Sequence, residues 1–195
     1  MGRAGQSQTT GGKDGITGGE GMTPLALQEF LVTEISALLE GFQLKNEAGE
    51  LSNISVLSQY SPVNDTGQVV HPFPFVRVIL KFAKDPSELA PYRCVILFVA
   101  GVYDNHLDCQ GYRDAINVLQ KIYDHLMRKR VFGQKYEVGY PVHWLLTDDM
   151  WKLTEDRWLT DEKWKLTDES SYPYFYVGLK TVWNIGKITM TDTLS

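Results

Sequence analysis

The chain has 195 residues and a mass of 22.1 kDa, a length typical of one domain with one core. Hydrophobic residues make up 43% of the sequence and aromatic residues 12%, and this composition excludes disorder for most of the chain. The formal net charge of -5 disfavours a protein that wraps nucleic acid, because phosphate binding requires clustered lysine and arginine.

Residues 1–21 form a first region that is rich in glycine and polar side chains. Because its few apolar side chains cannot offset the entropy cost of ordering, we expect a flexible arm, either native or left over from cloning. Gly12-Lys13 would need a glycine five residues earlier and a Ser or Thr afterwards to form a phosphate-binding loop. The sequence has Ser7 and Asp14 at these positions, so we expect no nucleotide site.

A helix is predicted next, with Thr23 as its N-cap, Pro24 at its first position and Gly41 just past its end. Its apolar residues fall on one stripe at helical spacing, and such a stripe must cover a sheet or another helix. The residues of this stripe are Leu27, Phe30, Leu31, Ile35, Leu38 and Leu39.

Two strands are predicted in the middle of the chain. Residues 75–82 mix alternation with β-branched side chains, and residues 94–103 are continuously apolar and therefore expected to be buried on both faces. The prolines between them suit an antiparallel hairpin with a long connection. A weaker strand is predicted at residues 54–60, and the following loop, residues 61–74, is expected to be exposed.

A second helix is predicted over residues 110–130, with Asp108 as its N-cap and an apolar face that packs on the sheet. Two more strands are predicted at residues 135–144 and 175–185. The order helix, strands, helix, strands predicts a single α+β domain over residues 22–195, with two main helices and a mostly antiparallel sheet.

A short unit that begins with tryptophan recurs before the last strand, and residues 147–170 are predicted to be an acidic insertion built from it. A spacing of seven residues between tryptophans fits a helical stripe, whereas the alternation and the threonine content fit a hairpin. The insertion is either an expanded surface hairpin or an aromatic contact platform for a neighbouring subunit, because tryptophan is enriched at interface cores.

Enzyme motifs give no support for catalysis. The sequence contains neither the nucleophile elbow G-x-S-x-G nor the zinc pattern H-E-x-x-H. Asp104, His106, Asp108 and Cys109 could offer metal ligands, but no second ligand pair accompanies them. A solvated loop with a helix N-cap is the favoured interpretation, so we expect no catalytic residue, metal or cofactor.

Signals for export and membrane insertion are also missing. The longest apolar run, residues 95–103, is far shorter than the roughly 20 residues that cross a bilayer, and residues 1–21 lack the pattern of an export signal. Cys94 and Cys109 form no framework of the kind that staples small secreted proteins, which indicates synthesis in a reducing cytoplasm.

Several short segments occur in an informative order between residues 72 and 185. They are Pro72-Phe-Pro-Phe-Val-Arg-Val78, Gly101-Val-Tyr-Asp104, Gln110-Gly-Tyr-Arg-Asp114, Asn117-Val-Leu-Gln-Lys-Ile122, Gly133-Gln-Lys-Tyr136, Tyr140-Pro-Val-His-Trp144, Tyr172-Pro-Tyr-Phe-Tyr176 and Thr181-Val-Trp-Asn-Ile185. With these segments in this order, the chain resembles a family of tail terminators and tail-to-head joining proteins from long-tailed phages and prophages of Gram-positive bacteria. The insertion and the glycine-rich arm depart from the family pattern.

The resemblance implies a structural virion protein whose copies form a hexameric ring that caps the tail tube and joins it to the head. Its partners would be further copies of itself, the tail tube protein and the head-tail connector or a neck protein. DNA would pass through the lumen without specific binding, past acidic walls that repel phosphate. The protein would be made in the cytoplasm of the bacterial host and would end up in the tail or neck of the virion.

Two alternatives stay open. One keeps the phage setting and makes the chain a head-completion or neck protein stacked on the connector. The other is a small α+β host enzyme or ligand-binding domain, for which a polar pocket with a nucleophile or base would be expected.

The expected subunit and partner contacts lie on three surfaces outside the predicted core. These are the loop of residues 61–74, the loop of residues 104–110 and the insertion, all of which carry polar or aromatic groups. The candidate contact residues are His71, Phe73, Asp104, His106, Asp108, Trp151, Trp158 and Trp164.

Overall fold

The computed structural model describes residues 22–67, 70–85, 87, 90–106, 108, 110–146 and 172–186. Three groups of predictions lie outside these residues. They concern the arm of residues 1–21, Cys109, and the insertion at residues 147–170 with its candidate contacts Trp151, Trp158 and Trp164.

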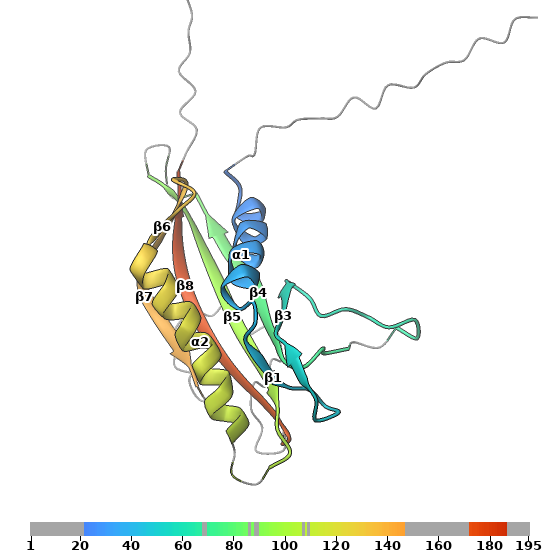
Figure 1. The fold of residues 1–195 in the computed structure, drawn as a ribbon. Helices are drawn as coiled ribbons and strands as arrows, with labels where there is room; N and C mark the ends of the chain where they lie inside the picture. The colour runs from blue at the N-terminus through green and yellow to red at the C-terminus, as the bar shows by residue number, and fades with distance from the viewer. Residues whose placement is uncertain are drawn as a thin grey trace, which may run out of the picture.

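The described residues form two layers, a six-stranded sheet and two helices that lie on one of its faces (Figure 1). The helices are α1 (Pro24–Leu38) and α2 (Gln110–Lys129). The strands of the sheet are β3 (Ser55–Ser58), β4 (Phe75–Lys84), β5 (Tyr92–Tyr103), β6 (Val131–Phe132), β7 (Tyr136–Leu145) and β8 (Tyr174–Ile185). They lie in the order β3-β4-β5-β8-β7-β6, which confirms the α+β class and the mostly antiparallel sheet.

Local signals determine where α1 begins and ends. Thr23 Oγ1 accepts a hydrogen bond from the backbone N–H of Ala26 at 3.1 Å, which caps the helix as predicted. The chain leaves the helix through Gly41, whose φ of +74° is a left-handed conformation that glycine adopts without a Cβ clash. The predicted apolar stripe faces the sheet, and its buried members are Leu27, Leu31, Ile35 and Leu39.

Strands β4 and β5 form the antiparallel pair that the sequence predicts. Their side chains alternate between the face under the helices and the opposite face. Val78 of β4 and Phe98 of β5 lie opposite each other in the main core, under the helices. Leu97 and Val99 belong to a smaller apolar cluster on the other face. Strand β5 is therefore buried on both faces, as its continuously apolar sequence predicts.

The second half of the chain also follows the prediction closely. Helix α2 packs on β5 and β8 through a face that includes the fully buried Leu119 and Ile122. Strands β7 and β8 begin and end within one residue of the predicted positions. The order helix, strands, helix, strands is thus confirmed.

Three features go beyond the prediction: a hairpin of β1 (Gln43–Lys45) and β2 (Leu51–Asn53), the short strand β6, and the parallel direction of β3 relative to β4. Asn46 Oδ1 holds the hairpin turn by accepting hydrogen bonds from the backbone N–H groups of Ala48 at 3.0 Å and Glu50 at 2.9 Å. Strand β3 is parallel because the chain returns to the same end of the sheet before β4 begins.

Candidate interaction surfaces

Aromatic side chains gather at the end of the sheet where β4 begins, β5 ends and β8 begins. Antiparallel pairing of β5 with both neighbours brings these three strand ends together. Phe73, just before β4, lies among them, with its ring centroid 5.0 Å from that of Tyr174 and 5.1 Å from that of Phe75. The residues of this aromatic end are His71, Phe73, Phe75, Tyr103, Tyr174 and Tyr176.

The prediction that residues 61–74 form an exposed loop is wrong at Ser61, at Pro74 and above all at the candidate contact Phe73. This side chain is only 7% exposed, because Tyr174 and Tyr176 of β8 pack against it. Phe73 therefore lies beneath the surface of the aromatic end. A partner protein would contact the residues around Phe73 before it could contact Phe73 itself.

His71, the other candidate contact of this loop, is half-buried. Ser61 Oγ lies 2.9 Å from His71 Nδ1, and the imidazole stacks on Phe75 with 5.6 Å between ring centroids. Burial lowers the pKa of His71, and the positive charge of Arg77 lowers it further. The ring is therefore neutral at pH 7 and holds the loop against the sheet.

Arg77 of β4 lies beside the aromatic end, on the sheet face opposite the helices. It is 3% exposed, and its guanidinium carbon lies 5.5 Å from the centroid of the Phe75 ring, a cation–π contact. Burial lowers the pKa of Arg77 and raises the pKa of Tyr176 to about 12. Lys180 of β8, 8% exposed and opposite Leu97, is another buried basic side chain on this face.

The loop between β5 and α2 contains the candidate contacts Asp104, His106 and Asp108. Asp104 Oδ2 accepts a hydrogen bond from the N–H of Gly111 at 2.7 Å, and its Oδ1 accepts one from the N–H of His106 at 3.1 Å. Asp108 Oδ1 accepts a hydrogen bond from the N–H of Gln110 at 3.3 Å. The prediction of Asp108 as the N-cap is wrong by one position, because α2 begins at Gln110; Asp108 and Asp104 both accept hydrogen bonds from N–H groups of the first turn, and Asp104 makes the shorter bond.

His106 and Asp108 are exposed, and the loop that carries them is tied to β8. Tyr172 Oη donates a hydrogen bond to the carbonyl oxygen of Asn105 at 2.7 Å, which fixes the loop beside the start of that strand. Within the part of the chain that the structure describes, no group of three or more His, Cys, Asp or Glu side chains could hold a metal ion. The hydrogen bond from Tyr172 therefore fixes the backbone of the loop, and the side chains of His106 and Asp108 are exposed on it.

The turn of the β1–β2 hairpin lies beside this loop and adds carboxylates to it. A small cavity of about 110 Å³ separates the turn from the end of β5, and Lys45 contributes one positive charge to its lining. Tyr174 Oη donates a hydrogen bond to Glu47 Oε1 at 3.0 Å, which holds the turn against the aromatic end. We call the exposed carboxylates Glu47, Glu50 and Asp108 the acidic end.

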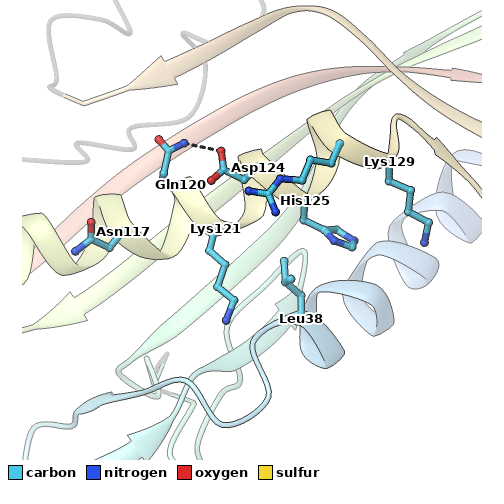
Figure 2. A pocket seen from close by; sticks show the side chains of 8 residues that line it. Leu38, Asn117, Gln120, Lys121, Asp124, His125 and Lys129 are labelled. Carbon is cyan, nitrogen blue, oxygen red and sulfur yellow. Dashed lines mark hydrogen bonds between the residues drawn. The ribbon is translucent and has the colours of Figure 1, made fainter.

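A groove runs along α2 beside the C-terminal end of α1 (Figure 2). Its volume is about 560 Å³, and most of its lining comes from α2. The residues that shape it are Leu38, Lys121, Asp124, His125, Arg128 and Lys129. Sequence reasoning missed this groove, although basic residues that return at helical spacing on one face of α2 could have indicated it.

Glu34 of α1 ties the two helices together at one side of the groove. Its Oε1 accepts hydrogen bonds from Lys129 Nζ and from His125 Nε2, both at 2.8 Å. The bond from Lys129 lowers the pKa of Glu34, and His125 adds to this effect. The charge of Lys129 is therefore partly neutralised, whereas Lys121 and Arg128 supply positive charge to the groove itself.

Both edges of the sheet are guarded against pairing with another strand. Strand β3 has only four residues. Just beyond its end, the side chain of Gln59 forms hydrogen bonds with the backbone N–H and carbonyl oxygen of Leu80 on β4. At the other edge, the two-residue strand β6 covers only Tyr136 and Glu137 of β7. Beyond them Pro141 of β7 has no N–H to donate, and the pairing of β7 with β8 shifts between Gly139 and His143. Loops and helix faces therefore offer better contact surfaces than strand edges.

The chain matches no known family model, and no curated protein matches it. Neither of the helices in the described ranges is long and apolar enough to cross a membrane. We therefore infer the function from the residues of this chain and from their arrangement in the fold.

Proposed function

We propose that the chain is a structural subunit of a long-tailed phage particle. Its copies form a ring, a hexamer in the family that the sequence resembles, which closes the tail tube and joins the tail to the head. The tail tube protein contacts one side of the ring and the head-tail connector or a neck protein contacts the other, while DNA passes through the lumen without specific binding. The support comes from how the segments that carry the resemblance pack together.

Three of these segments, residues 72–78, 101–104 and 172–176, meet at the aromatic end. This convergence is the observation that carries the proposal. A Cβ atom on Gly101 would lie 2.5 Å from ring atoms of Phe75, so the glycine of one segment is required by the aromatic ring of another.

A fourth segment, residues 110–114 at the beginning of α2, packs against the same group of segments. A Cβ atom on Gly111 would lie 2.6 Å from Asp104 Cβ and 2.6 Å from the ring of Phe175. Only glycine therefore allows the helix to begin this close to β5 and β8. The segments are interdependent parts of one packed end of the molecule.

The polar side chains that could suggest catalysis form hydrogen bonds and packing contacts within the fold. His71 is bonded to Ser61 and stacked on an aromatic ring, and Asp104 caps the beginning of α2. Glu34 accepts its bonds from the neighbouring helix. Packing and capping account for each of these groups, so the proposal is a non-enzymatic protein that works without a metal or cofactor.

A ring of identical subunits needs two different and complementary surfaces on every copy. Because the sheet edges are guarded, these surfaces come from the loops and from the helix-covered side. The aromatic end with its attached loops and the groove on α2 are separate surfaces of this kind.

Deletion of the gene from the phage that carries it tests the proposal against its alternatives. The proposal predicts overlong or ragged tails by electron microscopy, and tails of normal length when the chain is supplied in trans. Tails of normal length that fail to join heads would indicate a neck protein instead. Normal infectious particles would contradict any role in the virion.

A further inference from the structure

We propose that the groove between α1 and α2 receives the acidic end of a second copy of this chain. The inference rests on the proposed ring and names the contact that builds it. Lys121 and Arg128 supply the positive charge on the groove side. Glu47, Glu50 and Asp108 are exposed and supply the negative charge on the other side.

The two surfaces lie at different places on one subunit. The acidic end consists of Asp108 just before α2 and of Glu47 and Glu50 between β1 and β2, whereas the groove lies along the middle and C-terminal half of α2. Lys121 and Arg128 lie about 16 and 27 Å from the beginning of α2 along a rigid helix, so one copy cannot bring its own Arg128 onto its own Asp108. The contact must join two copies head to tail, and such a contact closes into a ring when its rotation allows.

Charge disfavours a symmetric pairing of the same surfaces. Groove against groove would bring Lys121 and Arg128 of both copies together, and acidic end against acidic end would bring carboxylates together. Both arrangements place like charges opposite each other, which disfavours them. Groove against acidic end is the attractive arrangement.

The chemistry of the groove favours a protein loop over DNA. Asp124 lies between Lys121 and Arg128 in the sequence of α2 and lines the same groove, so the two positive charges do not form the continuous basic track that a phosphate backbone requires. Leu38 adds an apolar border that a protein loop can cover. A volume of about 560 Å³ accommodates a few side chains of a loop tip.

Charge reversal on the two surfaces tests the contact. The groove variant carries Lys121→Glu and Arg128→Glu, and the acidic-end variant carries Glu50→Lys and Asp108→Lys. Each variant alone should associate on the order of 100-fold more weakly than the unchanged chain, because like charges then face each other. Light scattering should give each a mass near the 22.1 kDa of one chain.

An equimolar mixture of the two variants should recover the assembly, because each altered surface then meets its complement in alternating subunits. The control variant Lys84→Glu reverses an exposed charge at the end of β4 that lies outside both the groove lining and the acidic end, and it should assemble normally. Circular dichroism on every variant checks that the fold is retained.

The possible failures are distinguishable. If the unchanged chain forms a ring and the groove variant forms it equally well, the groove proposal is wrong and the ring stands. If the unchanged chain stays a monomer at every concentration, both proposals are wrong. If the groove variant loses binding to double-stranded DNA while its assembly is unchanged, the groove is a DNA site and this proposal is wrong.

Discussion

The side-chain amide of Gln59 pairs with the backbone of Leu80 as a neighbouring strand would. Gln59 Oε1 accepts a hydrogen bond from the N–H of Leu80 at 3.0 Å, and Gln59 Nε2 donates one to its carbonyl oxygen at 3.4 Å. Gln28 of α1 supports this arrangement by donating to Gln59 Oε1 at 2.9 Å and to the carbonyl oxygen of Val78 at 2.8 Å. Two glutamines thus close the edge of β4 at Leu80, just beyond the last residue that pairs with β3.

Replacement of Gln59 by alanine should therefore destabilise the protein and expose a strand edge. Half-buried backbone groups of Leu80 and the Gln28 amide would lose partners, at a cost of about 1–3 kcal/mol in the free energy of unfolding. Urea denaturation measures this loss, and turbidity at high concentration detects edge-to-edge association. Gln43→Ala is the matched control, because Gln43 makes its amide hydrogen bond to Asn53 on the exposed hairpin. Equal stability of the two variants would contradict the edge-closing role.

The packing of Gly101 against Phe75 gives a second prediction. A methyl group at position 101 would overlap the Phe75 ring, which is itself buried, so Gly101→Ala should lower the free energy of unfolding by about 1–3 kcal/mol. At Gly139 of β7 a Cβ atom would have no neighbour closer than 3.8 Å, so Gly139→Ala should be tolerated. Chemical denaturation of both variants makes the comparison. A stable Gly101→Ala variant would show that the aromatic end is loosely packed.

The ion pair between α1 and α2 predicts a pH dependence of stability. The bond from Lys129 holds the pKa of Glu34 below its ordinary value of 4.5. A lowered folded-state pKa stabilises the protein above pH 4.5, and this stabilisation is lost as the pH falls through the folded value. Glu34→Gln should therefore lower the Tm at pH 7, and the difference from the unchanged chain should shrink at about pH 3.

Glu40→Gln serves as the control for this pH dependence, because Glu40 is exposed just after α1 ends. Its Tm should follow that of the unchanged chain across the pH range. A Glu34→Gln variant whose deficit is the same at both pH values would mean that packing, and not the ion pair, explains its loss of stability.

The buried thiol of Cys94 gives a prediction about chemical reactivity. Burial raises the pKa of Cys94 to about 12, and the thiolate is the form that reacts with alkylating reagents. In a chain with Cys109→Ser, Cys94 should resist iodoacetamide at pH 8 and react once urea unfolds the protein. Mass spectrometry detects the added group. Rapid alkylation of the folded chain would contradict the burial of Cys94 in the main core.

Elements with strong local signals could be predicted from the sequence. Thr23, Pro24 and Gly41 mark the ends of α1 through hydrogen bonding and backbone geometry that depend on neighbouring residues alone. The parallel direction of β3 could not be predicted, because it depends on where the following loop returns to the sheet. The β1–β2 hairpin escaped prediction because its strands have three residues each, too few for a periodic pattern.

The candidate surfaces depend on contacts that no local pattern contains. Phe73 stands in a polar, proline-rich loop, and it is buried because β8 places Tyr174 and Tyr176 against it. Arg128 at the end of α2 fits a helix terminus by sequence alone. The groove beside it exists because α1 ends next to α2, which only the packed structure defines.

The central claim is that this chain works as one subunit among identical copies. Size-exclusion chromatography with multi-angle light scattering on the purified 195-residue chain measures the number of copies in the assembly. We expect one species whose mass is a fixed multiple of 22.1 kDa and stays constant over a wide range of concentrations. A mass of 22.1 kDa at every concentration would contradict it.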